Sequence, residues 1–342
     1  MIYSMPLGKR NCWRLGDLAL RLAMALALVS GIGVASRAEA AETITLKAVT
    51  PFNPEMYLSK PLFIFKDLVE KETNGRIQIK ILGAEEAVPS QQQFDALRNG
   101  VLDVIVGVTS YYAGQVPEGM ALLYTRQQPS EQRSSGLYDA LRKAHLDKAG
   151  VIYLANAGGT PGTGFRLYLR TKIDKPDLSG LKLRVSPVYT ALVQALGGTP
   201  VSIPFADAYS SLERGVVDGF GSTYAGITDY GLNEVSKYVV NPPFYSVNEA
   251  ILFNKDTWDA MPEDLRNQLE SIGVEFEKAV EQYMTDYITS EDELLKSKGM
   301  EFITFTGDDA KKYLDLAYAE GWKAFLEKTP DSGAEIKALA EK

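Results

Sequence analysis

The chain has one cysteine and one histidine, and this scarcity excludes several kinds of chemistry. Cys12 lies near the N-terminus, and His145 has no second histidine to share a metal with. Disulfides, thiol nucleophiles, most zinc sites and most catalytic triads are therefore not expected. The motifs HExxH, GxSxG and GxxxxGK[ST] are also missing, so we expect neither an enzyme nor a bound cofactor.

Long apolar runs are missing as well, except near the N-terminus. There a basic segment that ends at Arg14 precedes an apolar run from Leu18 to Val34. Ala38 and Ala40 then frame a small-x-small cleavage motif, so we expect a signal peptide over residues 1–40, cut near Ala40/Ala41. A retained membrane anchor is the alternative, but the run is short and rich in alanine and glycine. The expected mature protein is soluble and periplasmic.

Positive charge is scarce too, since 36 Lys and Arg face 44 Asp and Glu. Loss of residues 1–40 removes five basic and two acidic residues, and the formal net charge changes from −8 to −11. Nucleic acid binding needs clustered basic side chains, so we expect no nucleic acid partner. The cleavage also removes Cys12. We expect a monomer.

Helical and strand patterns alternate along the rest of the chain. This order predicts an α/β fold, with mostly parallel sheets covered by helices. The expected strands are 43–49, 76–82, 101–108, 151–155, 165–171 and 180–186. The expected helices are 57–73, 90–98, 188–196, 262–298 and 308–326.

Two segments repeat one pattern, Leu-x-x-Gly-Val-x-Asp, at 96–103 and 211–218. Chance similarity between two αβ units is one explanation, and two lobes with one plan are the other. Hydroxyl and aromatic side chains follow each repeat, at 108–112 and 220–224. Open α/β sheets bind ligands beyond the carboxyl ends of their strands, so a two-lobed fold would have its ligand there.

The glycine-rich loop at 160–164 is the expected crossing between the lobes, with a second one near 245–250. We therefore assign 41–164 plus about 250–295 to lobe I, and 165–249 plus about 296–342 to lobe II. The helix expected at 262–298 has a length of about 50 Å at about 1.5 Å per residue, enough to lie across both lobes.

Arg184 is the strongest single candidate for binding. Leu183 and Val185 alternate with it, so its side chain lies on the polar face of its strand. From this pattern alone, a solvated arginine is the more common outcome. The functional alternative is a guanidinium in a cleft that binds a carboxylate through two parallel hydrogen bonds.

The segment Gly180–Val185 resembles the Gly-Leu-Lys-[Leu/Ile]-Arg-Val motif of TRAP (tripartite ATP-independent periplasmic) transporter solute-binding proteins of the DctP type. Further stretches agree with that family in order and spacing, over nearly all of 43–330. They are 74–77, 100–103, 164–166, 203–209, 215–219 and 258–263. The resemblance implies the periplasmic binding protein fold of type II, two lobes that close on a ligand.

The resemblance also implies roles for particular residues. Arg184 matches the carboxylate-binding arginine, Arg166 a second arginine that assists it, and Phe205 an aromatic that packs on the ligand. Ser222 stands where other members have Asn or Trp. Val108 and Tyr111 stand where sialic-acid-binding members have an acidic and a basic residue, which argues against sialic acid.

The expected ligand is therefore a small organic acid, and an aromatic or largely apolar monocarboxylate is favoured. The remaining candidates for its walls can equally be core residues, and Asn248 can equally hold a turn or strand edge. These candidates are Phe52, Tyr57, Tyr111, Tyr224, Tyr245 and Asn248.

The expected function is capture of the acid by lobe closure and its delivery to TRAP membrane permease subunits. A binding protein of an ATP-driven importer or of a sensor is one alternative. A secreted enzyme is the other.

Overall fold

The computed structural model describes residues 1, 43–159, 161–224 and 226–342. The expected signal peptide and its cleavage site lie outside these residues. Among the residues that are described, no helix is both long and apolar enough to cross a membrane. Residues 43–342 form one compact unit.

Lobe I is built on two groups of strands. β1 (Ile44–Ala48) and β2 (Ile77–Ile81) pair in parallel. β3 (Val104–Val108), β10 (Glu249–Asn254) and β4 (Val151–Asn156) form an antiparallel sheet with β10 in the middle. The backbone N–H of Asp103 donates to the carbonyl of Lys47 over 2.9 Å, so the two groups adjoin.

Lobe II has one sheet with the order β11-β9-β5-β8-β6-β7. β6 pairs in parallel with both β7 and β8, while β5 is antiparallel to β8. Its strands are β5 (Arg166–Leu169), β6 (Lys182–Val185), β7 (Thr199–Ser202), β8 (Gly219–Ser222), β9 (Tyr238–Asn241) and β11 (Glu301–Thr304).

Helices pack on both faces of the β3-β10-β4 sheet and of the lobe II sheet, whereas β1 and β2 expose Thr45, Gln78 and Lys80 on one face. The expectation of mostly parallel sheets is wrong, because β10 and β5 are each antiparallel to both of their neighbours. In lobe I the helices are α2 (Lys60–Glu72), α3 (Gln93–Arg98), α4 (Ala121–Tyr124), α5 (Pro129–Ser135), α6 (Leu137–Ala149) and α10 (Lys255–Ala260). In lobe II they are α7 (Thr190–Ala195), α8 (Ala208–Glu213) and α9 (Leu232–Val235).

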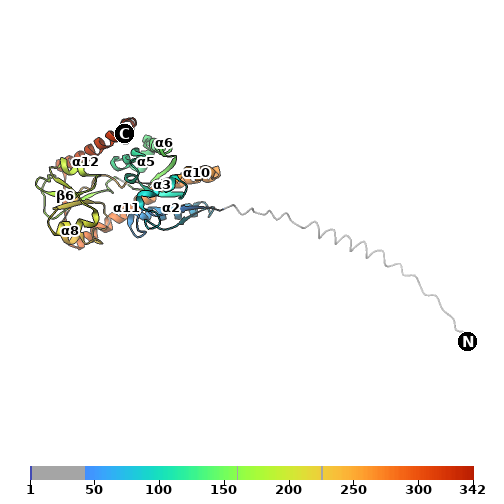
Figure 1. Cartoon of the computed structure of the whole chain (residues 1–342), viewed down its shortest axis with the longest axis horizontal. Helices are drawn as coiled ribbons and strands as arrows, with labels where there is room; N and C mark the ends of the chain where they lie inside the picture. Colours follow the sequence, from blue (N-terminus) through green and yellow to red (C-terminus); the bar gives the residue numbers. More distant parts are fainter. Residues whose placement is uncertain (2–42, 160, 225) are drawn as a thin grey trace. The chain divides into compact units, whose positions relative to one another are not determined.

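The helix α11 (Glu263–Ser297) connects the lobes. Its first half packs through residues such as Leu269 and Phe276 against the core of lobe I. Near its end, Leu295 packs with Phe220 and Leu212 in the core of lobe II. Figure 1 shows α11 between α2 and α3 on one side and β6 and α8 on the other. The expected long helix across two α/β lobes is confirmed.

The repeated sequence pattern has the same structure in both lobes. In each copy a glycine with left-handed φ ends a helix, Gly100 at 71° and Gly215 at 68°. In each copy the aspartate side chain accepts from the backbone N–H of a lysine on a neighbouring strand that comes earlier in the chain, β1 or β6. Asp103 accepts from Lys47, and Asp218 from Lys182, both over 2.8 Å. The two lobes therefore share one local plan.

The C-terminal helices contact both lobes. α12 (Gly307–Lys328) packs against α7 of lobe II and α4 of lobe I. α13 (Gly333–Ala340) packs against α5 and α6, and the carbonyl of Ala340 accepts from the hydroxyl of Thr125 over 3.2 Å. The proposed division of the chain into lobes stays a prediction.

Candidate functional site

Arg166, Arg184 and Ser222 lie on one face of the lobe II sheet. Their neighbours Leu167 and Leu183 point to the opposite face, where α7 and α12 pack. In the register of the sheet, Arg166 is directly opposite Ser222 on the central strand β8. Strand alternation thus places two guanidinium groups and a hydroxyl side by side, on the face that α11 also covers.

Arg184 has hydrogen bonds but no ion pair among the described residues. Its Nε donates to the carbonyl of Ile203 over 2.9 Å, and one terminal nitrogen donates to the hydroxyl of Tyr189 over 3.2 Å. Two of the five N–H donors of a guanidinium are thereby used, which leaves three. The side chain is half-buried, with its charge centre 5.3 Å from the ring of Phe205. This arrangement can hold an anion.

Arg166 is paired already. Its two terminal nitrogens donate to the two carboxylate oxygens of Asp292 on α11, one of them over 3.1 Å. The side chain is only 4% exposed and lies 4.3 Å over the ring of Tyr224. In this conformation the guanidinium of Arg166 is therefore neutralised by the protein itself.

The other lobe II candidates surround these arginines. Phe205 packs at the edge of the lobe II core and meets Tyr230 edge to face, with the ring centroids 5.4 Å apart. Tyr224 is buried, and its hydroxyl donates to the carbonyl of Gly162 over 3.4 Å. Ser222 is buried at the end of β8.

A cavity of about 510 Å³ lies between the lobes. Five candidates line it, namely Phe52, Val108, Tyr111, Tyr245 and Asn248. Lobe II contributes Phe165, Thr223 and the segment 186–188 to the wall. Arg184, Arg166, Phe205, Ser222 and Tyr224 do not line it, although Thr223 follows Ser222 and Ser186 is two residues after Arg184. The structure therefore places the candidates in two neighbouring groups.

Six aromatic side chains lie in the wall of this cavity, beside aliphatic and polar residues. Tyr111 is 40% exposed and meets Phe52 edge to face at 6.2 Å. Tyr245 is buried, and its hydroxyl donates to the carbonyl of Ala317 on α12 over 2.9 Å. Asn248 donates to the hydroxyl of Thr109 over 2.8 Å. A largely apolar ligand surface fits such a wall.

Two acidic residues near these groups were not predicted from the sequence. Asp292 pairs with Arg166 across 126 positions of the chain, and no local pattern reveals that contact. Glu249 lines the cavity and is buried. Burial raises the pKa of the Glu249 carboxyl well above its ordinary value. The sequence could have indicated Glu249 as a candidate, because it is the only charged residue of the otherwise mostly apolar segment 243–253.

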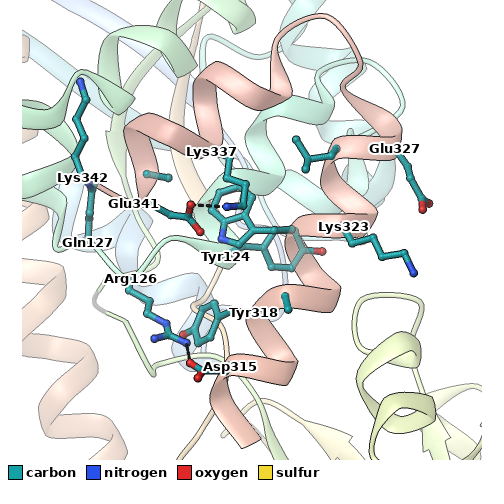
Figure 2. A pocket seen from close by; sticks show the side chains of 14 residues that line it. Tyr124, Arg126, Gln127, Asp315, Tyr318, Lys323, Glu327, Lys337, Glu341 and Lys342 are labelled. Atoms are coloured by element: carbon teal, nitrogen blue, oxygen red, sulfur yellow. Dashed lines mark hydrogen bonds and ion pairs between the residues drawn. The ribbon is translucent and has the colours of Figure 1, made fainter. Parts of the chain in front are cut away.

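A second hollow, of about 1080 Å³, lies on the outer surface between α12, α13 and the segment after α4. Figure 2 shows Lys337 paired with Glu341 and Arg126 with Asp315 along its walls. The guanidinium of Arg126 also lies 4.0 Å over the ring of Tyr318. Four of its charged groups are thus paired with each other. It contains none of the candidate site residues, although Tyr124 borders both cavities.

The part of the chain that the structure describes contains no candidate metal site. No group of three or more His, Cys, Asp or Glu side chains there is arranged to hold an ion.

Known proteins resemble the chain over most of its length. The sequence profile described as "Bacterial extracellular solute-binding protein, family 7" (DctP) matches residues 56–328. The C4-dicarboxylate-binding periplasmic protein DctP of Rhodobacter capsulatus is 26% identical, over 86% of this chain and 88% of that protein.

Solved structures share the fold. A TRAP periplasmic solute-binding protein of Desulfovibrio salexigens with bound orotic acid superposes with a TM-score of 0.72 at 22% identity, covering 87% of this chain and 97% of that one. A marine metagenome TRAP solute-binding protein in complex with pyroglutamate gives 0.68 at 18% identity, covering 87% and 99%.

Proposed function

This chain belongs to the DctP family of bacterial extracellular solute-binding proteins, and from that premise we propose that Arg184 binds the carboxylate of a small organic acid between the two lobes. The family consists of TRAP periplasmic solute-binding proteins, which bind solutes and are not enzymes. The observation that carries the proposal is that Arg184 has no ion-pair partner among the described residues and keeps three free N–H donors. Its strand leads directly into residues 186–188, which line the interlobe cavity.

Arg184 is better suited to the carboxylate than Arg166. Asp292 neutralises Arg166, whereas Arg184 has no acidic partner among the residues described. A planar guanidinium with free terminal nitrogens matches the two oxygens of a carboxylate. In this proposal Arg166 keeps Asp292 and supports the site through Ser222 and Tyr224.

We propose an aromatic or otherwise largely apolar monocarboxylate as the ligand. Support comes from the wall formed by Phe52, Tyr111, Tyr245 and Val108. The relative from Rhodobacter capsulatus is named for C4-dicarboxylates, and the two structural neighbours hold orotic acid and pyroglutamate. These ligands differ in size and polarity, but each has a carboxylate.

The proposed mechanism is closure of the lobes on the ligand. Closure excludes water, and the lower local dielectric strengthens the attraction between Arg184 and the carboxylate. The segments near 160–165 and 245–250 are the proposed hinge, since Phe165 and Phe244 form an isolated bridge there. The closed monomer would then deliver the acid to the membrane permease subunits.

The family is extracytoplasmic, which places the protein in the periplasm. We propose that signal peptidase cuts between Ala40 and Ala41, because Ala38-Glu39-Ala40 has the small-x-small pattern that this enzyme cuts.

The experiment begins with native mass spectrometry of periplasmic protein purified without refolding. A thermal-shift screen of organic acids follows, and calorimetry measures the affinity of each hit. We expect tight binding of a small carboxylate. Tight binding only to neutral sugars, amines or metal ions would contradict the proposal.

A further inference from the structure

Glu249 is the first residue of β10 and lies at the interlobe cavity. It is directly opposite Val108 on β3, and both residues line the cavity wall. Ile251 and Phe253, which alternate with it, pack on the side of the sheet that α11 covers. The side chain of Glu249 therefore lies on the α11 side of lobe I. Arg184 and Ser222 occupy the α11 side of lobe II.

The carboxyl group of Glu249 is isolated. The residue is 1% exposed, and neither side-chain oxygen has a hydrogen-bond partner in the described part of the chain. The titratable groups that interact with it are three tyrosines, Tyr57 before α2, Tyr111 after β3 and Tyr283 on α11. Lys328 and Glu320 of α12 are the other charged groups among the described residues that line the cavity, and neither pairs with Glu249.

Such isolation is costly unless the group has a partner. A buried ionised carboxylate without a cation or hydrogen-bond donors is strongly disfavoured, and the group takes up a proton instead. Burial accordingly raises the pKa of the Glu249 carboxyl well above its ordinary value. A protonated carboxyl group has one O–H donor and keeps an acceptor oxygen. In the absence of ligand, both functions are unused.

We propose that Glu249 is a second recognition residue for the ligand, and that its neutral carboxyl group donates a hydrogen bond to an oxygen of the ligand other than those bound by Arg184. This inference rests on the proposed function, because it places the ligand carboxylate on Arg184. This hydrogen bond would narrow the class of ligand. The ligand is a carboxylate that also has a hydroxyl, keto or amide oxygen.

The charges in the cleft favour a neutral donor over an ionised acid. The ligand is an anion, and an ionised Glu249 in the same water-poor cavity would repel it. A neutral carboxyl group avoids this repulsion and rejects ligands that lack an acceptor, because its buried O–H would then remain unpaired. Glu249 would thus select for ligands with a second acceptor oxygen, whereas the aromatic wall selects only for ligand shape.

The test compares two replacements of similar size. Glu249→Gln keeps a neutral group with a donor and an acceptor, whereas Glu249→Leu removes both. Glu263→Gln, at an exposed glutamate that does not line the cavity, is the matched control and should bind the probes like wild type. Calorimetry at neutral pH, in buffers with EDTA and without added metal, uses lactate, pyruvate, pyroglutamate, orotate and butyrate as probes. Butyrate has no oxygen beyond its carboxylate.

The proposal expects Glu249→Gln to bind the tightest probe within about threefold of wild type, and Glu249→Leu to bind it about tenfold or more weakly. Wild-type affinity should fall at alkaline pH as Glu249 ionises, and Glu249→Gln should lack this fall. Equal losses in both variants, or a requirement for a cation, would mean that an ionised Glu249 is needed. Wild-type affinity in Glu249→Leu would also overturn the proposal.

Infrared difference spectroscopy of the ligand-free protein supplies a measurement that needs no ligand. At neutral pH the wild type should show the carbonyl band of a protonated carboxyl group that Glu249→Gln lacks, and absence of this band would refute the neutral state. Arg184→Ala in the same titrations separates the proposed role of Arg184 from the proposed role of Glu249. If no probe binds wild type, the proposed function fails. If binding depends on Arg184 but not on Glu249, only this inference fails.

Discussion

Replacing Arg184 by alanine removes the group to which the account assigns the ligand carboxylate. In the structure, Nε of Arg184 is fixed by Ile203 and one terminal nitrogen by Tyr189. The side chain is therefore held in place before ligand binds, with its remaining donors free. Preorganisation of this kind means that little conformational entropy is lost when the ligand binds.

The size of the effect follows from the burial of the pair. Truncating one partner of a buried, hydrogen-bonded charge pair costs about 2–5 kcal/mol. At about 1.4 kcal/mol per tenfold, the affinity should fall by roughly 30-fold to several-thousand-fold. Arg184→Lys should recover only part of this loss, since an ammonium keeps the charge but not the two-pronged geometry. Folding should lose about 1 kcal/mol, because the carbonyl of Ile203 loses its donor.

Titration calorimetry of the native ligand measures the effect, with a melting curve as the check on folding. Lys182→Ala is the matched control, since Lys182 lies on the same face of β6 but is exposed. Its affinity should match wild type. If Arg184→Ala binds within about threefold of wild type, an effect below roughly 0.7 kcal/mol, the carboxylate site lies elsewhere.

Three further predictions follow from the same contacts. Arg166→Ala should weaken ligand binding less than Arg184→Ala but destabilise the fold more, because it leaves Asp292 without its partner; the reverse order in calorimetry and melting curves would contradict this. Burial, with Asp229 and Asp292 nearby, raises the pKa of Glu291 to about 7. The native state then holds a proton that the unfolded state releases near pH 4.3, so this group should lower stability progressively as pH rises from about 4.3 to about 7, and its effect should level off above that. In urea unfolding, the stability of Glu291→Gln relative to wild type should therefore be higher at pH 8 than at pH 5. The same difference at both pH values would refute the raised pKa of Glu291. N-terminal sequencing of exported protein should begin near Ala41, and a start at Met1 would exclude cleavage.

Much of the fold was accessible from local patterns. The period of the apolar residues predicted β2, expected at 76–82 and found at 77–81, and α11, expected at 262–298 and found at 263–297. The repeated Leu-x-x-Gly-Val-x-Asp pattern marked the equivalent αβ corner of each lobe, because the left-handed glycine that ends each helix is a local requirement. The hydrogen bonds that each aspartate accepts span 56 and 36 positions of the chain, and no local pattern reveals them.

The site was accessible only in part, because its chemistry depends on contacts between distant segments. Strand alternation predicted the face of the sheet on which Arg184 lies. It could not predict that Arg184 has no acidic partner among the described residues. Arg166 has the same strand context, yet α11 brings Asp292 to it. The isolation of Glu249 likewise depends on which side chains reach the start of β10 from three other segments.

A structure of the protein with its native acid bound would show directly whether Arg184 holds the carboxylate. Crystals of material purified without refolding, or soaked with the tightest acid of the screen, would show where the carboxylate lies. The account predicts that the acid lies between the lobes, with its two carboxylate oxygens on the terminal nitrogens of Arg184. An acid in the outer hollow between α12 and α13, or one whose carboxylate does not contact Arg184, would contradict it.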